Sequence, residues 1–465
     1  MSVKSIQFIL SIILFSIILS CKMNEETKLN SIGIEEEIKT AQLIVETALR
    51  ERKGYEYLRE LSEIGPRLSG SENSMKAINW ALDKMKSLGF DNVRLQPVMV
   101  PHWERGKTES CTIVDLKKNL SVLALGGSIA TPPEGITDEV IEIKNFEELF
   151  KRKEEAKGKI VFFSRALDQG QINTMAGYGG AVDQRVDGAA EAAKYGAVGV
   201  VIRSITTKYD NIPHTGVMIY NDTIPKIPAA ALGYVDSDFL SNELTKNPHL
   251  KLNLVLNCKT LPDAQSYNVI GEIRGSEFPD EIILVGGHFD SWDVGQGLHD
   301  DGAGCIQSLE VLDLFKRLNI KPKRTIRCVF FINEENGSCG AKEYADYADS
   351  SKQKHLAVIE SDRGAFTPIG FYAETDSTEI LNKLQSWLPM LEKANIEWVR
   401  KGGSGVDVGR IKNAVVRIGY VPDDQRYMDY HHSANDVFEA VHPREFELGS
   451  AAIAILTYLL SEEGL

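Results

Sequence analysis

The sequence predicts an α/β fold: an α/β/α domain around a mixed, mostly parallel sheet, with a smaller α/β domain inserted into it. Three short apolar runs, residues 282–285, 326–332 and 356–359, have the length and composition of buried strands. Strands covered by helices on both faces give such continuous runs, because neither face meets water. A long interruption before the first run, with short strands of its own, predicts the inserted domain.

The first elements along the chain are two helices and a strand. Apolar residues fall at helical spacing over residues 34–49. A second helix is expected at about 73–88, ending at Gly89, because glycine is favoured just beyond helix C-termini. A strand follows at 93–100. A C-terminal segment, 443–460, opens with proline and is apolar on a wide face, which predicts a core helix packed on the sheet.

The pattern changes over residues 122–256. Short strands are expected at 160–163 and 198–202, an Ala-rich helix at 188–195 and a Pro-Ala segment at 227–231. A chain of 465 residues is long enough for two domains. The predicted organisation is therefore a first part of the main domain, the inserted domain, and a second part that carries the site: residues 22–121, 122–256 and 257–465.

Acids and histidines directly follow the apolar strands. His288 and Asp290 end the first run, and Asp300 with Asp301 opens a helix ten residues later. The other strand ends and a late segment add Glu334, Glu335, Glu360, Asp362, His431 and His432. Buried acids are costly unless paired or metal-bound, and zinc accepts imidazole nitrogen and carboxylate oxygen. One such acid is usually a helix cap or a surface residue; repetition at three strand ends predicts a metal site where α/β sheets place their sites.

The motifs around these residues resemble those of the M28 family of di-zinc exopeptidases, and within it the plasma glutamate carboxypeptidase (carboxypeptidase Q) group. The resemblance covers nearly the whole mature chain. One residue departs from the family pattern, because Val437 follows Asp436 where the family has threonine. The segments that carry the resemblance are Gly65–Ser71, Val100–Gly106, Gly287–Gly297, Asp300–Gly304, Asn333–Gly337, Glu360–Asp362 and His431–Ser433.

The resemblance implies a zinc-peptidase sandwich that binds two Zn²⁺ per chain and a role for each site residue. The implied metal ligands are His288, Asp300, Glu335, Asp362 and His432. Asp300 would bridge the ions, with His288 and Asp362 on one and His432 and Glu335 on the other. Glu334 would be the general base. Asp290 would accept the second ring N–H of His288 and fix its orientation.

The neighbouring residues have other expected roles. Asp301 would cap the helix that begins near Gly302, and the family has a cis peptide between Asp300 and Asp301. His431 is expected to be a packing or substrate-side neighbour, and His299 to face the pocket rim or solvent. The remaining histidines have no acids at ligand spacing and are expected to be structural: His102, His214, His249, His355 and His442.

The residues themselves predict two-metal hydrolysis, and the resemblance narrows it to a peptide bond at a chain end, in dipeptides or short peptides. Aminopeptidase, dipeptidase and carboxypeptidase action are not separable, because the family uses similar metal sites for all three. The alternatives are a single-zinc acyltransferase similar to glutaminyl cyclases and a non-catalytic receptor or scaffold on the same fold. The inserted segment resembles a protease-associated domain, which would lie over the site and shape substrate access; a purely structural insertion is the alternative. The resemblance also allows a homodimer.

Charge and the N-terminus bear on partners and compartment. The net charge of −14 argues against general nucleic-acid binding. Lys4 precedes an apolar stretch, residues 6–19, which suits a secretory signal better than a membrane span. The stretch ends in Ile18-Leu19-Ser20-Cys21, which resembles a bacterial lipobox. We therefore expect an exported lipoprotein anchored through Cys21, periplasmic or on the outer face; an ordinary signal peptide or an uncleaved anchor is the alternative.

The cysteine pattern indicates neither a disulfide framework nor a cysteine zinc site. Five cysteines remain beyond Cys21, an odd number, and no Cys-x-x-Cys occurs. Cys305 and Cys328 have apolar neighbours and are expected in the core. Cys111 and Cys258 flank the inserted segment, so the sequence allows one disulfide between them.

Overall fold

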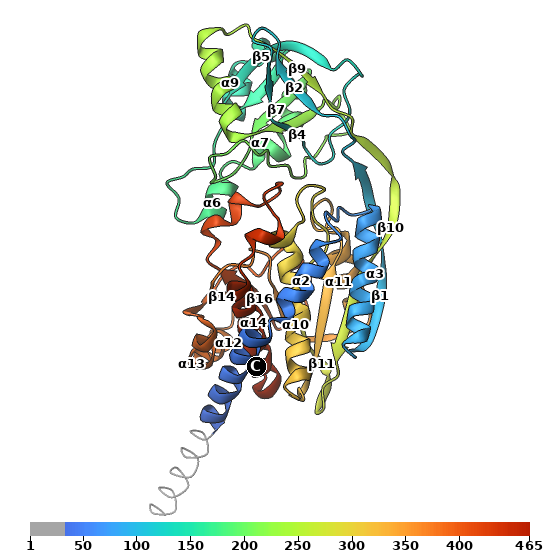
Figure 1. The fold of residues 1–465 in the computed structure, drawn as a ribbon, viewed down its shortest axis with the longest axis vertical. Coiled ribbons are helices and arrows are strands. Elements are labelled where there is room, and N and C mark those ends of the chain that lie inside the picture. The colour runs from blue at the N-terminus through green and yellow to red at the C-terminus, as the bar shows by residue number, and fades with distance from the viewer. Residues whose placement is uncertain (1–32) are drawn as a thin grey trace, which may run out of the picture.

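The computed structural model describes residues 33–465, arranged as a larger α/β/α unit and a smaller α/β unit stacked on it (Figure 1). The described chain enters through a helix at 33–51 on the far side of the larger unit from the smaller one. The predicted signal segment and Cys21 lie outside the described residues. Across residues 33–465, no helix has both the length and the apolar character needed to cross a bilayer.

The larger unit is built on an eight-stranded mixed sheet in which four of the seven strand pairings are parallel. The predicted mixed, mostly parallel sheet is therefore confirmed. In order across the sheet the strands are β1 (Asp91–Glu104), β10 (Lys259–Ile273), β12 (Arg324–Phe331), β11 (Phe278–His288), β13 (Lys354–Glu360), β16 (Val416–Pro422), β14 (Pro368–Glu374) and β15 (Trp398–Lys401).

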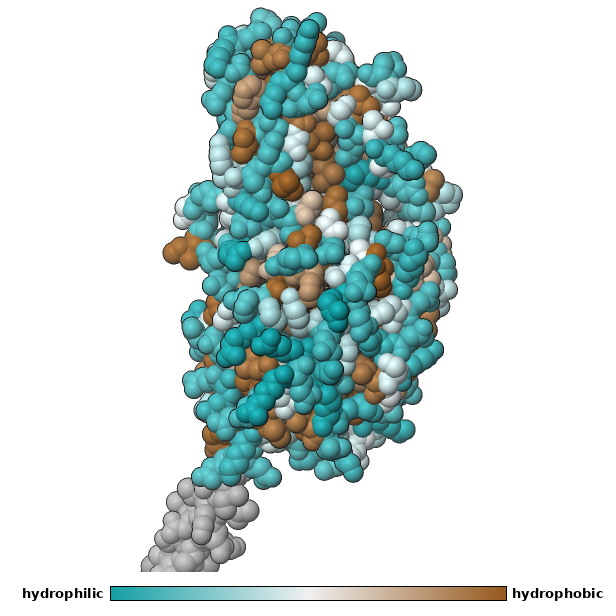
Figure 2. Space-filling view, in the orientation of Figure 1, coloured by the Kyte–Doolittle hydropathy of each residue, from teal (hydrophilic) through white to brown (hydrophobic). Residues whose placement is uncertain are grey.

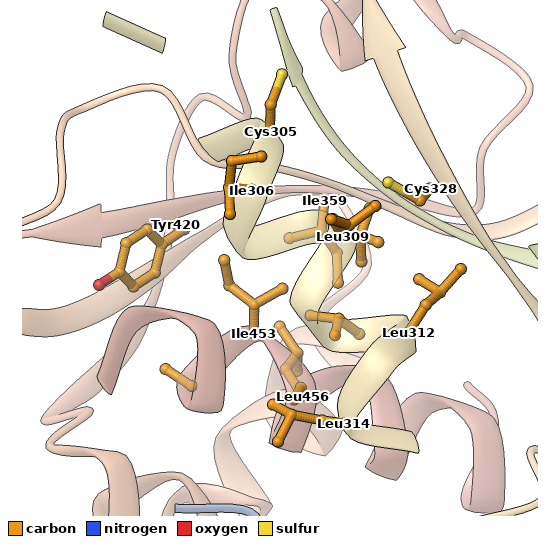
Figure 3. Packing of buried hydrophobic residues seen from close by; sticks show 14 of the residues in the cluster. Cys305, Ile306, Leu309, Leu312, Leu314, Cys328, Ile359, Tyr420, Ile453 and Leu456 are labelled. Carbon is orange, nitrogen blue, oxygen red and sulfur yellow. The ribbon is translucent and has the colours of Figure 1, made fainter. Parts of the chain in front are cut away.

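Helices cover both faces of this sheet. Alternate residues of β11 point to opposite layers: Ile283 and Val285 pack in the cluster with α10 (Ala303–Arg317) and α14 (Pro443–Glu463), whereas Leu284 packs with α11 (Cys339–Ser350). Figure 3 shows the first layer, in which side chains of α10 and α14 interdigitate beside the sheet. Both faces are dry, which explains the continuous apolar runs in the sequence. Cys305 and Cys328 are core residues of this layer, as predicted.

The remaining helices of the larger unit agree with the local sequence signals. The side chain of Ser71 accepts a hydrogen bond from the backbone N–H of Ser74 at 3.1 Å and caps the second predicted helix. Gly89, with a φ of 69°, follows that helix in the left-handed conformation. These helices and turns are α2 (Lys53–Ser62), α3 (Glu72–Ser87), η1 (Leu298–Gly302), α12 (Thr378–Ser386), α13 (Leu388–Leu391), η2 (Glu392–Ala394), η3 (Val408–Arg410), η4 (Asp424–Asp429) and η5 (Phe438–Ala440).

The smaller unit has its own eight-stranded sheet. Its first two strands precede residue 122, so the second sheet begins earlier than the expected boundary. They are short and only partly apolar, which hid them in the sequence. In order across the sheet the strands are β3 (Lys118–Leu120), β2 (Ser110–Ile113), β9 (Lys251–Val255), β5 (Ile136–Ile143), β6 (Ile160–Phe163), β7 (Gly199–Arg203), β8 (Ala229–Leu232) and β4 (Val122–Ala124). Its helices are α4 (Phe146–Lys151), α5 (Lys153–Ala156), α6 (Thr174–Gly179), α7 (Asp183–Val186), α8 (Gly188–Ala193) and α9 (Tyr234–Lys246).

A long antiparallel ribbon joins the two units. Strands β1 and β10 pair from Asp91 opposite Glu272 to Glu104 opposite Lys259, and they run along one side of the molecule toward the smaller unit (Figure 1). Cys111 and Cys258 lie beyond the end of this ribbon as buried free thiols, so the disulfide that the sequence allowed is not formed. The face drawn in Figure 2 is largely hydrophilic, with apolar residues in small separate groups.

Candidate metal centre

Three parallel strands end side by side where the two units meet. Strand β11 ends at His288, Glu334 and Glu335 follow β12, and Asp362 follows β13. His432 comes from the segment after η4, which lies beneath the smaller unit (Figure 1). These residues are buried or partly buried, and all of them line one cavity of about 240 Å³ together with Asp300. The structure therefore brings together every predicted metal ligand and the predicted base.

The two carboxylate oxygens of Asp300 face different partners. Oδ1 lies 3.2 Å from Nε2 of His288, which is also 3.6 Å from Oδ1 of Asp362. Oδ2 lies 3.3 Å from Nε2 of His432, which is 3.0 Å from Oε2 of Glu335. Asp300 thus separates two sets of donors, each with one imidazole nitrogen and one further carboxylate.

This donor set fits divalent zinc. Tetrahedral zinc with ligand bonds of about 2.0–2.1 Å places neighbouring donor atoms about 3.3 Å apart, close to the separations within both sets. Oδ2 of Asp300 and Oε1 of Glu335 are buried without a hydrogen-bond partner, as atoms reserved for a cation would be. Burial, and next the charge of Asp300, raises the pKa of the Glu335 carboxyl well above its ordinary value. Positive ions between these acids would offset both the burial of Glu335 and its repulsion by Asp300, and so favour the ionised carboxylate.

Glu334 lines the same cavity without belonging to either donor set. Its backbone N–H donates to Oδ1 of Asp290 at 3.0 Å, which holds the start of the loop after β12. Burial raises the pKa of the Glu334 carboxyl to about 8, and the nearby Glu335 and Asp362 add to the rise. A carboxyl group with a raised pKa beside metal ligands suits a general acid–base residue.

Asp290 does not hold His288 in the predicted way. Nδ1 of His288 lies 3.0 Å from the backbone carbonyl oxygen of Asp290, not from its carboxylate. The carboxylate accepts instead from Ser69 Oγ at 3.1 Å and from the backbone N–H groups of Glu334 and Glu335 at 3.0 and 3.4 Å. Asp290 therefore orients His288 through its main chain and the loop that carries Glu334 through its side chain.

The neighbouring residues divide between confirmed and wrong predictions. The Asp300–Asp301 peptide is cis, as the resemblance implied. Asp301 accepts from the N–H groups of Gly304 and His288 at 3.0 and 3.1 Å, so it caps α10. His299 was expected at the rim or in solvent, but it is fully buried and stacks between Phe366 and Tyr430.

His431 agrees with its expected place beside the site. Its ring stacks on that of His432 with 3.5 Å between the centroids, and its Nε2 lies 3.9 Å from Oδ2 of Asp300. Nε2 of His432 is the closer of the two to that oxygen, which favours His432 as the ligand. His431 also borders the cavity, on the side where Tyr178 contacts its ring edge-on.

The resemblance implied that the inserted domain would lie over the site and shape substrate access, but it did not identify which residues of that domain line the cavity. Met175, Tyr178, Arg185 and Val217 of that unit line it together with the candidate ligands. Arg185 is 6% exposed, and its Nη1 lies 3.2 Å from Nδ1 of His432. One signal existed: Arg185 is the single basic residue of the Gly- and Ala-rich stretch 166–193.

Imidazole and carboxylate donors at the ends of parallel strands, with a further glutamate facing them, define the site of a metal-dependent hydrolase. The model of peptidase family M28 matches residues 268–456. Carboxypeptidase Q of Bos taurus is 36% identical over 415 residues, which span 89% of this chain and 86% of the relative. The chain belongs to peptidase family M28 and is a metallopeptidase.

Solved structures agree with this assignment. The crystal structure of a peptidase M28 precursor from Shewanella amazonensis has a TM-score of 0.88 and 33% sequence identity, covering 93% of this chain and 98% of that one. A zinc aminopeptidase from Bacillus subtilis shares the fold with a TM-score of 0.63 at 20% identity, covering 87% of this chain and 95% of that one. The α/β/α zinc-peptidase sandwich that the sequence predicted is therefore confirmed as the fold.

Proposed function

We propose that this metallopeptidase is an exported exopeptidase that binds two zinc ions, hydrolyses dipeptides or short peptides, and recognises the free carboxylate of its substrate. The observation that carries the two-ion part is the division of Asp300, whose oxygens face His288 at 3.2 Å and His432 at 3.3 Å. A carboxylate with one donor set on each oxygen suits a bridge between two ions.

The presence of both donor sets supports two ions over one or none. The five ligands carry three carboxylates, and Glu334 adds a fourth beside them. Bound Zn²⁺ would compensate these acids, because a buried carboxylate is costly unless it is paired or metal-bound. A single-zinc acyltransferase would need only one donor set, and a scaffold protein would need neither. This chain keeps both sets and the base.

The chain's own groups fit peptide hydrolysis. Zinc ions, when bound, supply Lewis-acid polarisation of a carbonyl and lower the pKa of water. Glu334, held by the backbone contact to Asp290, would take the proton from the attacking water and deliver it to the leaving amine. His288 is oriented for its role by the carbonyl of Asp290, and His432 by the carbonyl of Thr215 at 3.3 Å.

Arg185 supports recognition of a substrate carboxylate. With Nε2 of His432 facing the acids, the proton of its neutral ring belongs on Nδ1, which leaves the nearby Nη1 of Arg185 facing a donor. Nε of Arg185 is buried without a partner, and no carboxylate of residues 33–465 forms an ion pair with this guanidinium. A buried, uncompensated guanidinium that lines the cavity is a ready partner for a carboxylate.

The shape of the cavity favours a small substrate. Its volume of about 240 Å³ is below the roughly 300–1,000 Å³ typical of ligand pockets. Tyr178 and Arg185 of the smaller unit form part of its wall. An arginine that pairs with the C-terminal carboxylate so near the ligands places the last peptide bond at the ions, which suits dipeptidase or carboxypeptidase action.

We also propose that the protein is exported and anchored through Cys21. The support is the basic Lys4, the apolar stretch 6–19 and the following Leu-Ser-Cys sequence. In this arrangement the helix at 33–51 would be nearest the membrane. The smaller unit would face away from it, because it lies at the other end of the larger unit (Figure 1). The cavity is lined by residues of both units and would lie on that side as well.

Metal counting and a blocked dipeptide panel test the proposed function. Protein lacking residues 1–21 would be loaded with zinc, analysed for metal, and assayed on dipeptides that are free, acetylated at the amine or amidated at the carboxylate, with and without chelator. We expect about two zinc ions per chain, chelator-sensitive cleavage, and loss of cleavage on amidation. One ion per chain with acyl transfer would favour the acyltransferase, and no metal with no cleavage would favour the scaffold.

A further inference from the structure

The smaller unit holds the segment that carries His432. Thr206 Oγ1 donates to the backbone carbonyl of Met428 at 2.8 Å, and Thr207 Oγ1 donates to the Asp429 carboxylate at 2.6 Å. Further along, His214 and Ser433 form an antiparallel bridge. Loop 204–217 of the smaller unit thus lies beside residues 428–433 of the larger unit and contacts them at several points.

The closest of these contacts joins Thr215 to His432 twice. The N–H of Thr215 donates to the carbonyl of His432 at 2.9 Å, and the carbonyl of Thr215 lies 3.3 Å from Nδ1 of the His432 ring. The first contact fixes the main chain of His432, which has an uncommon positive φ of 60°. The second fixes the ring so that Nε2 faces Asp300 and Glu335. Both the place and the direction of this ligand therefore depend on Thr215.

Thr215 is in turn held by Arg105 at the end of the β1–β10 ribbon. Nη2 of Arg105 lies 3.4 Å from Thr215 Oγ1, which itself donates to the carbonyl of Ala124 at 2.8 Å. The guanidinium of Arg105 also donates two hydrogen bonds, of 2.6 and 2.9 Å, to the carboxylate of Asp293. Arg105 is 8% exposed, so water competes little with these contacts.

Asp293 lies on the loop that begins directly after His288. A continuous chain of contacts therefore runs from the loop of one predicted histidine ligand, through Asp293, Arg105 and Thr215, to the other histidine ligand. Trp292 of the same loop packs against the His432 ring at 5.8 Å and meets the backbone of Gly126, where a Cβ atom would overlap its ring. The loop and the smaller unit enclose His432 from two sides.

We propose that Arg105 is a positioning residue for the metal centre: through Thr215 it fixes His432, and thereby sets the affinity of the one metal position that uses His432 and Glu335. The smaller unit is then a structural part of that position, beyond any role in shaping access. This inference rests on the proposed function, because it requires His432 to be a metal ligand. His288 and Asp362 do not contact Thr215, so the other position should be much less sensitive.

Metal binding to the full chain tests this role without relying on activity. Apo-protein would be titrated with Co²⁺, followed by its visible absorption, and with Zn²⁺ in competition with a chelator. The variants are Arg105→Gln and Asp293→Asn, with Arg152→Gln as the matched control. Arg152 lies in the smaller unit. It pairs with Glu148 and Glu155, both at 2.9 Å, and takes no part in this chain of contacts. Circular dichroism and thermal melting would check folding.

We expect Arg105→Gln to weaken one of two metal-binding steps about 10–100-fold, the range for residues that orient a ligand. Asp293→Asn should weaken the same step less, and the double variant should match Arg105→Gln, because both act on one chain of contacts. Arg152→Gln should bind like the parent. Unchanged binding by both folded variants, or equal weakening of both steps, would overturn the proposal. A parent protein that binds fewer than two ions would instead refute the two-zinc function.

Discussion

Replacement of Arg185 by glutamine separates the proposed carboxylate recognition from other roles of the cavity. The guanidinium is buried, its Nε has no partner, and its Nη1 lies 3.2 Å from Nδ1 of the His432 ring. The change Arg185→Gln keeps hydrogen-bond donors but removes the charge and the forked geometry. Gly216 packs closely against the guanidinium, with a φ of 135°, so the arginine has little freedom to reach another partner.

The expected loss follows from the burial of the contact. Truncating one partner of a buried, charged hydrogen-bonded pair costs about 2–5 kcal/mol. At about 1.4 kcal/mol per factor of ten, kcat/KM for a dipeptide with a free carboxylate should fall about 30-fold to several thousand-fold. Glutamine can still donate to the carboxylate, which places the expected loss near the lower end. An amidated dipeptide never makes the ion pair, so its rate should change by less than about threefold.

The assay compares kcat/KM for free and amidated forms of one dipeptide, in the parent and in Arg185→Gln and Arg185→Lys. Lysine keeps the charge without the fork and should give an intermediate loss. Zinc content is measured in parallel, because Arg185 lies next to His432. Equal losses on free and amidated substrates, at unchanged zinc content, would refute the assignment of Arg185 to the carboxylate.

Three further outcomes are expected. Glu334→Gln should keep its zinc but lose about 10²–10⁴-fold in kcat, since it cannot accept a proton; near-normal turnover would remove Glu334 as the base. Burial, and next the charge of Glu310, raises the pKa of Glu447 to about 10 from an ordinary 4.5, so the folded chain keeps a proton that the unfolded chain loses. The contribution of Glu447 to stability should therefore fall as the pH rises from about 5 toward 10, and urea unfolding should show that Glu447→Gln is more stable relative to the parent at pH 9 than at pH 5. Cys21→Ser should move the protein from the membrane fraction to the soluble fraction of its native type of host, and unchanged fractionation would count against the lipid anchor.

The predictions that held rest on signals within one short stretch of chain. His288 comes shortly after the apolar residues 282–285, and Glu334 and Glu335 come shortly after the largely apolar strand 326–332, so each strand and the candidate site residue at its end lie in the same short segment. Because parallel strands end at one edge of the sheet, adjacency in the sequence becomes proximity in space. The structure adds what the residue types alone left open, namely that the oxygens of Asp300 divide between His288 and His432.

The predictions that failed required knowledge of orientation or of distant partners. Asp290 carries both a carbonyl and a carboxylate close to His288, and only the structure shows that the carboxylate accepts hydrogen bonds from Ser69 and from the backbone of Glu334. Burial of His299 depends on Phe366 and Tyr430, each more than sixty residues away. The local sequence pattern around His299 contains no information about these distant partners, so it does not predict that the ring is buried.

The contribution of the smaller unit illustrates the same limit at the scale of the site. Arg185 and Thr215 lie more than two hundred residues before His432, in a region that the sequence predicts to be an inserted domain without identifying which of its residues reach the site. Neither Arg185 nor Thr215 belongs to a recognised motif. Thr215 contacts His432 through its backbone, and such a contact does not depend on the type of side chain, so the sequence does not indicate it. Yet these two residues are the ones that face the ring of His432 from the side away from the acids. If the chain of contacts through Arg105 sets one metal affinity, then the insertion and the catalytic sheet are constrained together. A change in the insertion would alter the metal centre without touching a ligand.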